Sequence, residues 1–382
     1  VRGFATTQIL GILLSLFCGI LVSRLITDFY TNKNRHFQYF TGISRRVFKH
    51  ASFKFIEYRK VAYGISVVVL ILGVGSFFHG FREGVEFQGG RSYVINFHKP
   101  VKQEEVTAAL EKVLTGTTPE IKTYDGNEQL EITTDYLIKQ SGPGTDSLVL
   151  NAVYSGVKGF LPDGTTFAQF ISSKSIFLQG STKVEPTISA DLKAGAVKAT
   201  VFAIIIIFIY IFIRFRDWRY SLGTIIALLH DVFVTLAVFS WLHGIVPFPL
   251  EINQHFIAAV LTVIGFSMND TVIVFDRIRE DSRLMKGASN GEIINKAVNE
   301  TLSRTIMTSL IVFLTLLILF LVGGEVTRGF AFAMLIGVIT GTYSSIFVAA
   351  PFLVDFAKGR PLGGDAPAKT PAQKTKPTTA KA

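Results

Sequence analysis

The sequence has little of what stabilises small secreted domains or covers the surface of soluble enzymes. Its 382 residues include one cysteine, Cys18, so no disulfide can form within the chain. Charged residues make up only 17% of the sequence and hydrophobic residues 49%, and the mean hydropathy is +0.43. This balance excludes an ordinary soluble globular protein and indicates an integral membrane protein.

Seven apolar runs are long enough to cross a membrane, since a spanning helix needs about 20 largely apolar residues. They cover residues 5–27, 61–80, 196–213, 220–242, 254–275, 305–323 and 330–354. More than a hundred residues separate the second run from the third, enough for a folded domain. We therefore expect a polytopic α-helical membrane protein with one domain outside the membrane, residues 81–195.

The distribution of Lys and Arg predicts the orientation, because these residues accumulate in cytoplasmic loops. Eight lie in 31–60, six in 276–304 and six after residue 356. The domain 81–195 is then predicted outside the cell membrane and the C-terminus inside. The formal charge of +10 is divided among loops rather than gathered on one face, so we expect no nucleic-acid partner.

Residues 81–195 have the pattern of a small α+β domain. "RSYVINFH" (91–98) alternates apolar and polar residues as a half-buried strand does, and apolar residues at helical spacing follow Pro100. Asp125-Gly126-Asn127 separates two strand-like segments, which is a hairpin signal. A helix near 146–158 and a strand near 175–184 complete a ferredoxin-like β-α-β-β-α-β order. Residues 158–173 do not fit this order and are interpreted as an insertion.

The predicted cytoplasmic segments differ in character. Residues 31–60 are interpreted as a basic linker, and residues 357–382, rich in Pro, Ala, Thr and Lys, as a disordered tail. In the loop 276–304, Ser289 stands three residues before Glu292, which is a capping box. Apolar residues follow on one helical stripe, Ile293, Ile294, Ala297, Val298 and Leu302. We expect an amphipathic helix along the inner membrane face.

Three charged residues lie in or beside the apolar runs, where a charge costs about 2.5–3.5 kcal/mol on insertion scales. Asp231 follows His230 near the centre of one run, Asp270 lies in the next, and Arg304 stands where the sixth run begins. Ser267 and Asn269 make a polar patch with Asp270. A structural explanation is open for each charge: Arg304 can extend its guanidinium to the membrane surface, and either aspartate can anchor neighbouring helices by hydrogen bonds.

Five motifs resemble those of the SecF half of SecDF, a protein-export family in the RND superfamily. They are "GVEFQGG" (84–90), "VEPTISADLKAGA" (184–196), "RFRDWRYSLGTIIALLHD" (214–231), "LTVIGFSMNDTVIVFDRIRED" (261–281) and "NETLSRTIMTSL" (299–310). The matching motif residues near the external domain are Gly84, Phe87, Gly89, Gly90, Pro186 and Thr187. Glu185 departs from the pattern, because a Gly is usual there, and a change in the hinge between domain and membrane is one expected consequence.

The resemblance also accounts for an internal repeat. "VRGFATTQILGILLSLFCGILV" (1–22) parallels "TRGFAFAMLIGVITGTYSSIFV" (327–348), and in this family each half ends on a sixth span. Residues 1–30 are thus expected to be the last span of a SecD half, and the chain the C-terminal part of a fused SecDF. Residues 61–80 would be the first SecF span, and 196–356 the other five spans of an RND-type bundle.

The resemblance implies a transport role without covalent chemistry, cofactor or metal. Such proteins lie in the inner membrane, assist the SecYEG channel and use the proton gradient to move a periplasmic domain that engages unfolded polypeptide. Asp270 and Arg304 would form the proton-responsive site, with Asp231 as an auxiliary partner and with Ser267, Asn269 and His230 in support. Besides the SecD half, SecYEG and the polypeptide, membrane lipid is an expected partner.

Alternative functions were weighed against this one. An RND exporter of small molecules or lipids is the main alternative, although such proteins usually carry much larger external domains. An intramembrane aspartyl protease would use Asp231 and Asp270 as a carboxylate pair that shares a proton. Its typical Gly-x-Gly-Asp context is absent, and "FSMND" stands in its place. A purely structural scaffold would differ from a pump in that loss of the proton gradient would not abolish its effect.

Overall fold

The computed structural model describes residues 2–32, 52–124, 128–140, 142, 144–172, 176–246, 248–357 and 362. The chain divides into two units, Val1–Ala51 and Ser52–Ala382. The first unit contains α1 (Arg2–Leu16), a π-helical turn η1 (Phe17–Val22) and α2 (Ser23–Thr31), and Ile9–Thr31 is apolar enough to span a membrane. Most of the predicted linker and nearly all of the predicted tail lie outside the described residues.

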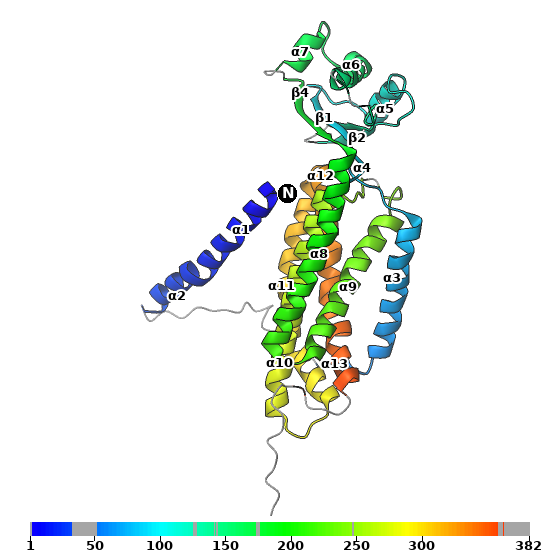
Figure 1. The fold of residues 1–382 in the computed structure, drawn as a ribbon. Coiled ribbons are helices and arrows are strands. Elements are labelled where there is room, and N and C mark those ends of the chain that lie inside the picture. The colour runs from blue at the N-terminus through cyan, green and yellow to red at the C-terminus, as the bar shows by residue number, and fades with distance from the viewer. Residues whose placement is uncertain are drawn as a thin grey trace, which may run out of the picture. The chain divides into compact units, whose positions relative to one another are not determined.

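The second unit contains the other membrane helices, which run side by side in one bundle (Figure 1). They are α3 (Arg59–His79), α8 (Pro186–Phe215), α9 (Trp218–Trp241), α10 (Gln254–Leu284), α11 (Asn290–Val322), α12 (Glu325–Ser344), η3 (Ser345–Ala349) and α13 (Ala350–Ala357). Counting the span in the first unit, seven helices of the described chain are long and apolar enough to cross a membrane. The prediction of a polytopic helical membrane protein is confirmed.

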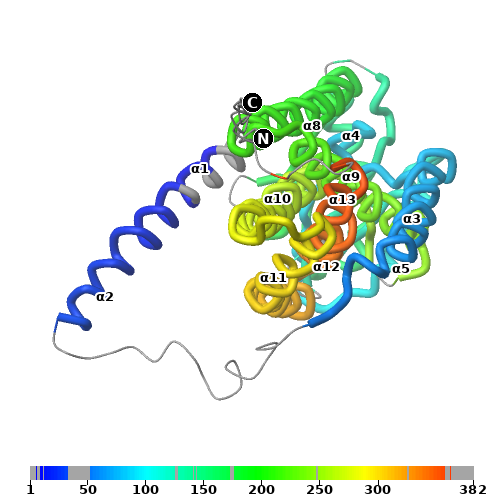
Figure 2. The backbone as a smooth tube through the Cα atoms, turned by 90° about the horizontal axis from the view of Figure 1, so that it is seen from below, coloured from blue at the N-terminus to red at the C-terminus, as the bar shows by residue number. Residues whose placement is uncertain are grey.

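α9 packs against α3, α8, α10 and α12, and α12 packs against α9, α10 and α11. In the view along the helices, α9 lies between α3 and α10, and α12 lies beside α11 (Figure 2). Small residues on α12 let it approach α10 closely. A Cβ added at Gly337 would lie 2.1 Å from Cγ2 of Val263, and one at Gly341 would lie 3.0 Å from Cβ of Ser267. This close approach places Ser267 of α10 and Ser344 of α12 within hydrogen-bonding distance of the same carboxylate, that of Asp231 on α9.

Three membrane helices, α8, α10 and α11, extend far beyond the apolar runs that predicted them. α8 begins at Pro186 and continues for 30 residues without a break, so it starts ten residues before the predicted span. Proline suits this position because the first turn of a helix needs no N–H from it. Glu185 precedes it with φ −73° and ψ 149°, an extended conformation open to any residue, so the usual Gly is not required there.

The predicted loop 276–304 is largely helical, because α10 continues to Leu284 and α11 starts at Asn290. The capping box of Ser289 and Glu292 is present, and the predicted apolar stripe is buried. The expected separate helix along the membrane face is wrong. Residues 290–302 form the first turns of α11 itself, because no Pro and no Gly after Gly291 interrupts the helix.

The external domain has a four-stranded antiparallel sheet in the order β2-β3-β1-β4. Its strands are β1 (Gly90–Asn96), β2 (Glu120–Thr123), β3 (Gln129–Thr134) and β4 (Leu178–Val184), and its helices are α4 (Val85–Gln88), α5 (Gln103–Glu111), α6 (Thr145–Val157) and α7 (Phe167–Ile171). Apart from the short helices α4 and α7, this is the predicted ferredoxin-like order. β2 and β3 pair as the predicted hairpin, whose turn residues 125–127 lie outside the described residues.

One face of the sheet carries the domain core against α5 and α6. Tyr93, Ile95 and Phe97 are buried there with apolar residues of β3 and of both helices. The segment interpreted as an insertion adds to this core through α7, whose Phe170 is completely buried, and the Tyr154 hydroxyl donates to the Thr165 carbonyl at 2.5 Å. The opposite, polar face of the sheet includes Lys122 and Glu131.

Candidate functional site

Asp231 is the centre of a hydrogen-bonded cluster inside the bundle. Its side chain is fully buried, and its Oδ2 accepts hydrogen bonds from Ser267 at 2.6 Å and from Ser344 at 2.8 Å. Its Oδ1 lies 3.2 Å from Nδ1 of His230. The carboxylate thus joins α9, α10 and α12, and it also contacts the side chain of His230, the preceding residue.

Asp270 has much poorer hydrogen bonding although it is also buried. The Ser309 hydroxyl of α11 lies 3.4 Å from its Oδ2, at the long limit of a hydrogen bond. Ser309 in turn lies 2.7 Å from the Thr342 hydroxyl of α12. Among the described residues, no cation comes within ion-pair distance of Asp270 and no hydrogen bond joins it to Asp231. The arrangement therefore does not favour a protease dyad that shares a proton.

Arg304 lies near this site without contacting it. Its side chain is exposed, although its charge acts on Asp270 electrostatically. The expected polar patch is divided: Ser267 binds Asp231, whereas Asn269 is exposed. The reason is helical geometry, because Ser267 and Asp270 lie three residues apart on one face of α10 and Asn269 does not share that face.

Apart from Ser267, the hydroxyl residues around the two aspartates were not predicted from the sequence. Besides Ser309, Thr342 and Ser344, they include Thr271 and Ser345, whose hydroxyl oxygens are 2.9 Å apart between α10 and η3. The available signal was the density of Ser and Thr in "ITGTYSS" (339–345), which is unusual within an apolar run. The described residues contain no group of three metal-ligating side chains.

The glycine-rich motif forms the joint between the external domain and the bundle. The Gly84 N–H donates to the Ile252 carbonyl at 2.9 Å, and the Ile252 N–H donates to the Arg82 carbonyl at 2.8 Å. Gly89 has φ +81°, and a Cβ on it would lie 3.4 Å from Cα of Pro186. A side chain is thus disfavoured at both glycines. At Gly84 the reason is a steric clash, because an added Cβ would lie 2.7 Å from Cβ of Asn253.

The other motif residues surround this joint. Phe87 is buried on α4, and Gly90, with φ +158°, begins β1 against the Thr134 carbonyl. Pro186 and Thr187 are exposed at the start of α8. The motif therefore fixes where two chain connections leave the domain, and the structure gives it a positioning role.

Four charged side chains form a cluster at the same joint. Lys122 Nζ lies 2.5 Å from Glu251, and an Arg82 nitrogen lies 2.6 Å from Glu120. Crossed contacts of 3.5 Å join Lys122 to Glu120 and Arg82 to Glu251. We call these four residues the junction cluster. Glu120 and Lys122 belong to β2, Arg82 follows α3, and Glu251 precedes α10.

Burial and charge pairing shift the pKa values of the junction cluster. Burial and then the interaction with Glu120 raise the pKa of Glu251 to about 8. The pKa of Glu120 is lowered, because Glu251, Lys122 and Arg82 together outweigh the effect of its burial. The pKa of Lys122 is raised for a similar reason, since the carboxylates of Glu251 and Glu120 outweigh its desolvation.

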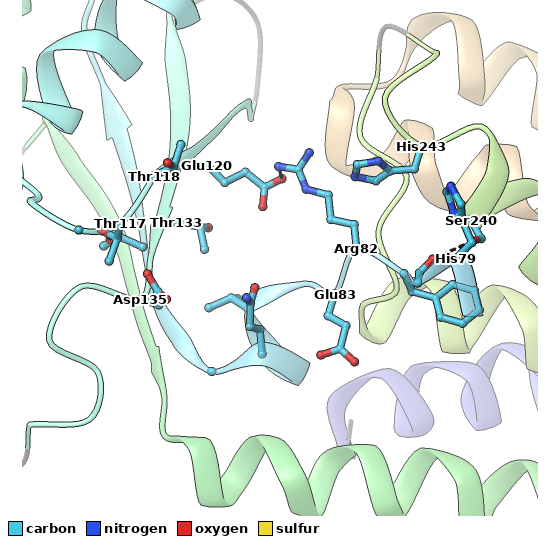
Figure 3. Close-up of a pocket in the computed structure, with 17 residues that line it drawn as sticks. His79, Arg82, Glu83, Thr117, Thr118, Glu120, Thr133, Asp135, Ser240 and His243 are labelled. Atoms are coloured by element: carbon cyan, nitrogen blue, oxygen red, sulfur yellow. Dashed lines mark hydrogen bonds and ion pairs between the residues drawn. The ribbon is translucent and has the colours of Figure 1, made fainter. Parts of the chain in front are cut away.

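Cavities lie on both sides of the junction cluster. Arg82 and Glu120 line a cavity of about 740 Å³ between the external domain and the bundle, and Figure 3 shows Arg82 extending toward Glu120 across it. Lys122 and Glu251 line a second cavity of about 230 Å³, together with Glu131 and His255. The external domain is thus joined to the bundle by a few specific contacts rather than by a continuous packed interface.

Comparison with known proteins places these features in a family. The family model described as "Protein export membrane protein SecD/SecF, C-terminal" matches residues 168–359, and the "SecD/SecF GG Motif" matches residues 74–101. The chain is 41% identical over 311 residues to protein translocase subunit SecF of Rhodothermus marinus, covering 81% of the chain and 95% of that protein.

Fused relatives match a longer part of the chain. Protein translocase subunit SecDF of Brucella abortus is 31% identical over 358 residues, covering 93% of the chain and 44% of that protein. The crystal structure of SecDF from Thermus thermophilus, a translocon-associated membrane protein, superposes with a TM-score of 0.72 at 27% identity. That match covers 93% of the chain and 45% of the solved one, so the chain spans less than half of these fused proteins.

Proposed function

Because the chain belongs to the SecF family, it is a multi-pass inner-membrane protein with an accessory role in Sec protein export, and we propose that it couples this role to the proton-motive force. The comparisons do not favour the alternative of a small-molecule or lipid exporter. Each elementary charge that crosses 100 mV releases about 2.3 kcal/mol, which is sufficient to bias a two-state conformational change.

The observation that carries the proposal is the environment of Asp270. Its carboxyl is buried in the bundle and has one long hydrogen bond, whereas Asp231 has three polar neighbours. A buried carboxylate without partners is unstable as an ion, so proton binding and release at Asp270 would change the packing of α10 against α11. Arg304 would stabilise the ionised form across a short, hydrated gap, and Asp231 would hold α9, α10 and α12 in register.

The remaining parts of the proposal concern orientation and partners. Residues 81–195 would be periplasmic and the C-terminus cytoplasmic, as the loop charges predict. The chain would act with a SecD half at the SecYEG channel. Residues 1–30 would correspond to the last SecD span of a fused protein, which the longer match to the Brucella abortus protein supports.

The external domain would contact unfolded polypeptide. β4 is the last strand of the sheet order and pairs only with β1 among the described strands, so its outer edge offers main-chain groups. Added strands bind through such groups with little dependence on side-chain identity. Crosslinking of arrested export intermediates should label residues 178–184. Labelling confined to SecYEG would contradict direct contact.

The proton site is tested by gradient-driven export in cells that make each variant at the normal level, with Asn269→Ala as the matched control on α10. Asp270→Asn and Arg304→Leu should lose the stimulation by the gradient and keep basal, ATP-driven export. Asn269→Ala should keep both, because Asn269 is exposed. Full stimulation with Asp270→Asn would refute the assignment of the proton site.

A further inference from the structure

The segment that precedes α10 connects the candidate proton site to the external domain. α10 carries Asp270 and begins at Gln254, three residues after Glu251. Glu251 is only 5% exposed and contacts Lys122 of β2 at 2.5 Å. A displacement of α10 along or around its axis therefore moves a carboxylate that is bound to the sheet.

The main chain reinforces this connection. Ile252 exchanges two backbone hydrogen bonds with Arg82 and Gly84 and forms a parallel bridge with Glu83. Glu83 in turn accepts from Lys193 of α8 at 2.5 Å. The segment 250–253 is thus tied to the connection that enters the external domain, and that connection is tied to α8.

The surroundings of the junction cluster leave space for movement. The 740 Å³ cavity lies on the side of Arg82 and Glu120, and the 230 Å³ cavity on the side of Lys122 and Glu251. A second contact with the bundle is made by Tyr124, the residue after β2, at Gly324, where an added Cβ would lie 2.7 Å from the Tyr124 carbonyl. This contact involves no charged side chain and resists separation less than the charge-assisted hydrogen bond from Lys122 to Glu251 does.

We infer that the hydrogen-bonded contact in which Lys122 donates to Glu251 at 2.5 Å is a latch that transmits movement of α10 to the external domain. The inference rests on the proposed function, because movement of α10 is there the consequence of proton exchange. With the latch closed, the sheet follows the start of α10. With the latch open, the domain turns about its two chain connections, and movement of α10 no longer reaches β2.

Spin-label distances test the latch without reference to export. The full chain with Cys18→Ser, Ser155→Cys on α6 and Val322→Cys on α11 reports the distance from the external domain to the bundle in lipid nanodiscs. Lys122→Gln and Glu251→Ala, which removes the acceptor of Lys122, should each broaden the distance distribution and shift it to longer values. The matched control is Lys102→Gln, which removes an exposed ion pair with Glu105 inside the external domain and should leave the distribution unchanged.

A second variant covers the case in which these variants misfold. Lys122→Cys with Glu251→Cys in the Cys18→Ser chain is joined by a cleavable bifunctional thiol reagent. The joined protein should keep gradient-stimulated export, whereas cleavage of the reagent should abolish the stimulation. An unchanged distribution in both single variants, or full stimulation after cleavage, would overturn the latch. Loss of all gradient stimulation in the unmodified chain would instead overturn the proposed function.

Discussion

At the scale of the residue, the two intramembrane aspartates differ in how many hydrogen bonds the protein provides to their carboxyl groups. Asp231 has hydroxyl donors from two other helices and an imidazole beside it. Asp270 has one hydroxyl at 3.4 Å. The same side chain is therefore a fixed anchor in one helix and a group with unmet hydrogen-bonding capacity in the next.

Truncation of Asp231 should destabilise the bundle. Asp231→Ala would leave the buried hydroxyl of Ser267 without its acceptor, whereas the Ser344 hydroxyl keeps the Gly341 carbonyl at 3.2 Å, and an unmet buried group costs about 1–3 kcal/mol. We expect the free energy of unfolding to fall by at least that amount in denaturant titrations of the protein in detergent micelles. Asn269→Ala should change it by less than about 0.5 kcal/mol, as exposed substitutions do. Equal losses in the two variants would show that Asp231 is not an anchor.

Glu251 gives the stability of the protein a specific pH dependence. Its pKa is raised from near 4.5 to about 8 in the folded protein, so between these values the folded state holds a proton that the unfolded state has released. The free energy of unfolding should therefore fall as the pH rises from about 4.5 to 8. One unit of pKa shift corresponds to about 1.4 kcal/mol, and we expect an effect of at least this size.

The matched variant is Glu251→Gln, which should lack this component of the pH dependence. Two neighbours contribute to the pH dependence of stability at other pH values. The pKa of Glu120 is lowered, so its contribution lies below the ordinary pKa of a glutamate, and the pKa of Lys122 is raised, so its contribution lies at alkaline pH. Glu86, Glu131 and His255 also line the adjoining cavity and are unchanged in both proteins. Denaturant titrations at several pH values give the difference between the two proteins. A constant difference would contradict the raised pKa.

At the scale of the element, the contact of α10 with α12 depends on a glycine without space for a side chain. A Cβ at Gly337 would lie 2.1 Å from Val263, whereas Gly265 has no atom within 4 Å of the same position. Gly337→Ala should destabilise the bundle by about 1–3 kcal/mol, as overpacking does. Gly265→Ala should be neutral or slightly stabilising, because alanine favours the helix.

Unfolding of the two glycine variants in the same detergent measures this difference. Both substitutions add one methyl group to a membrane helix, so helix propensity and apolar area change alike. If Gly337→Ala is as stable as Gly265→Ala, then α12 moves away from α10 without cost. The positions of the Ser267 and Ser344 hydroxyls at Asp231 are then not fixed by close packing.

The elements themselves were predicted from hydrophobic patterns, but the ends of α8, α10 and α11 were not. Apolar runs identified each membrane helix because burial in lipid requires such runs. α8, α10 and α11 continue into polar sequence that the bundle and the external domain stabilise by contacts far apart in the chain. Asp231 and Asp270 were found because a carboxyl in an apolar run is conspicuous, whereas a hydroxyl such as Ser309 acquires its role only from the neighbour that packing provides.

At the scale of the whole molecule, the proposed topology is open to a direct test. In the Cys18→Ser chain, single thiols are placed at two exposed positions, one by Ser155→Cys on α6 of the external domain and one by Lys286→Cys between α10 and α11. A membrane-impermeant maleimide should label residue 155 in spheroplasts and residue 286 only after lysis. The reverse pattern would overturn the orientation and with it the export role.

The direct passage from β4 to α8 restricts how this protein can be recombined with its relatives. One residue, Glu185, separates the last strand of the external domain from a helix of 30 residues. Each residue inserted into a helix rotates the preceding part of the chain by about 100° around the helix axis and shifts it by about 1.5 Å along that axis. A domain grafted from another member of the family must therefore keep the length of this junction. A graft one residue too long would face a different direction above the membrane, even with every contact inside the domain preserved.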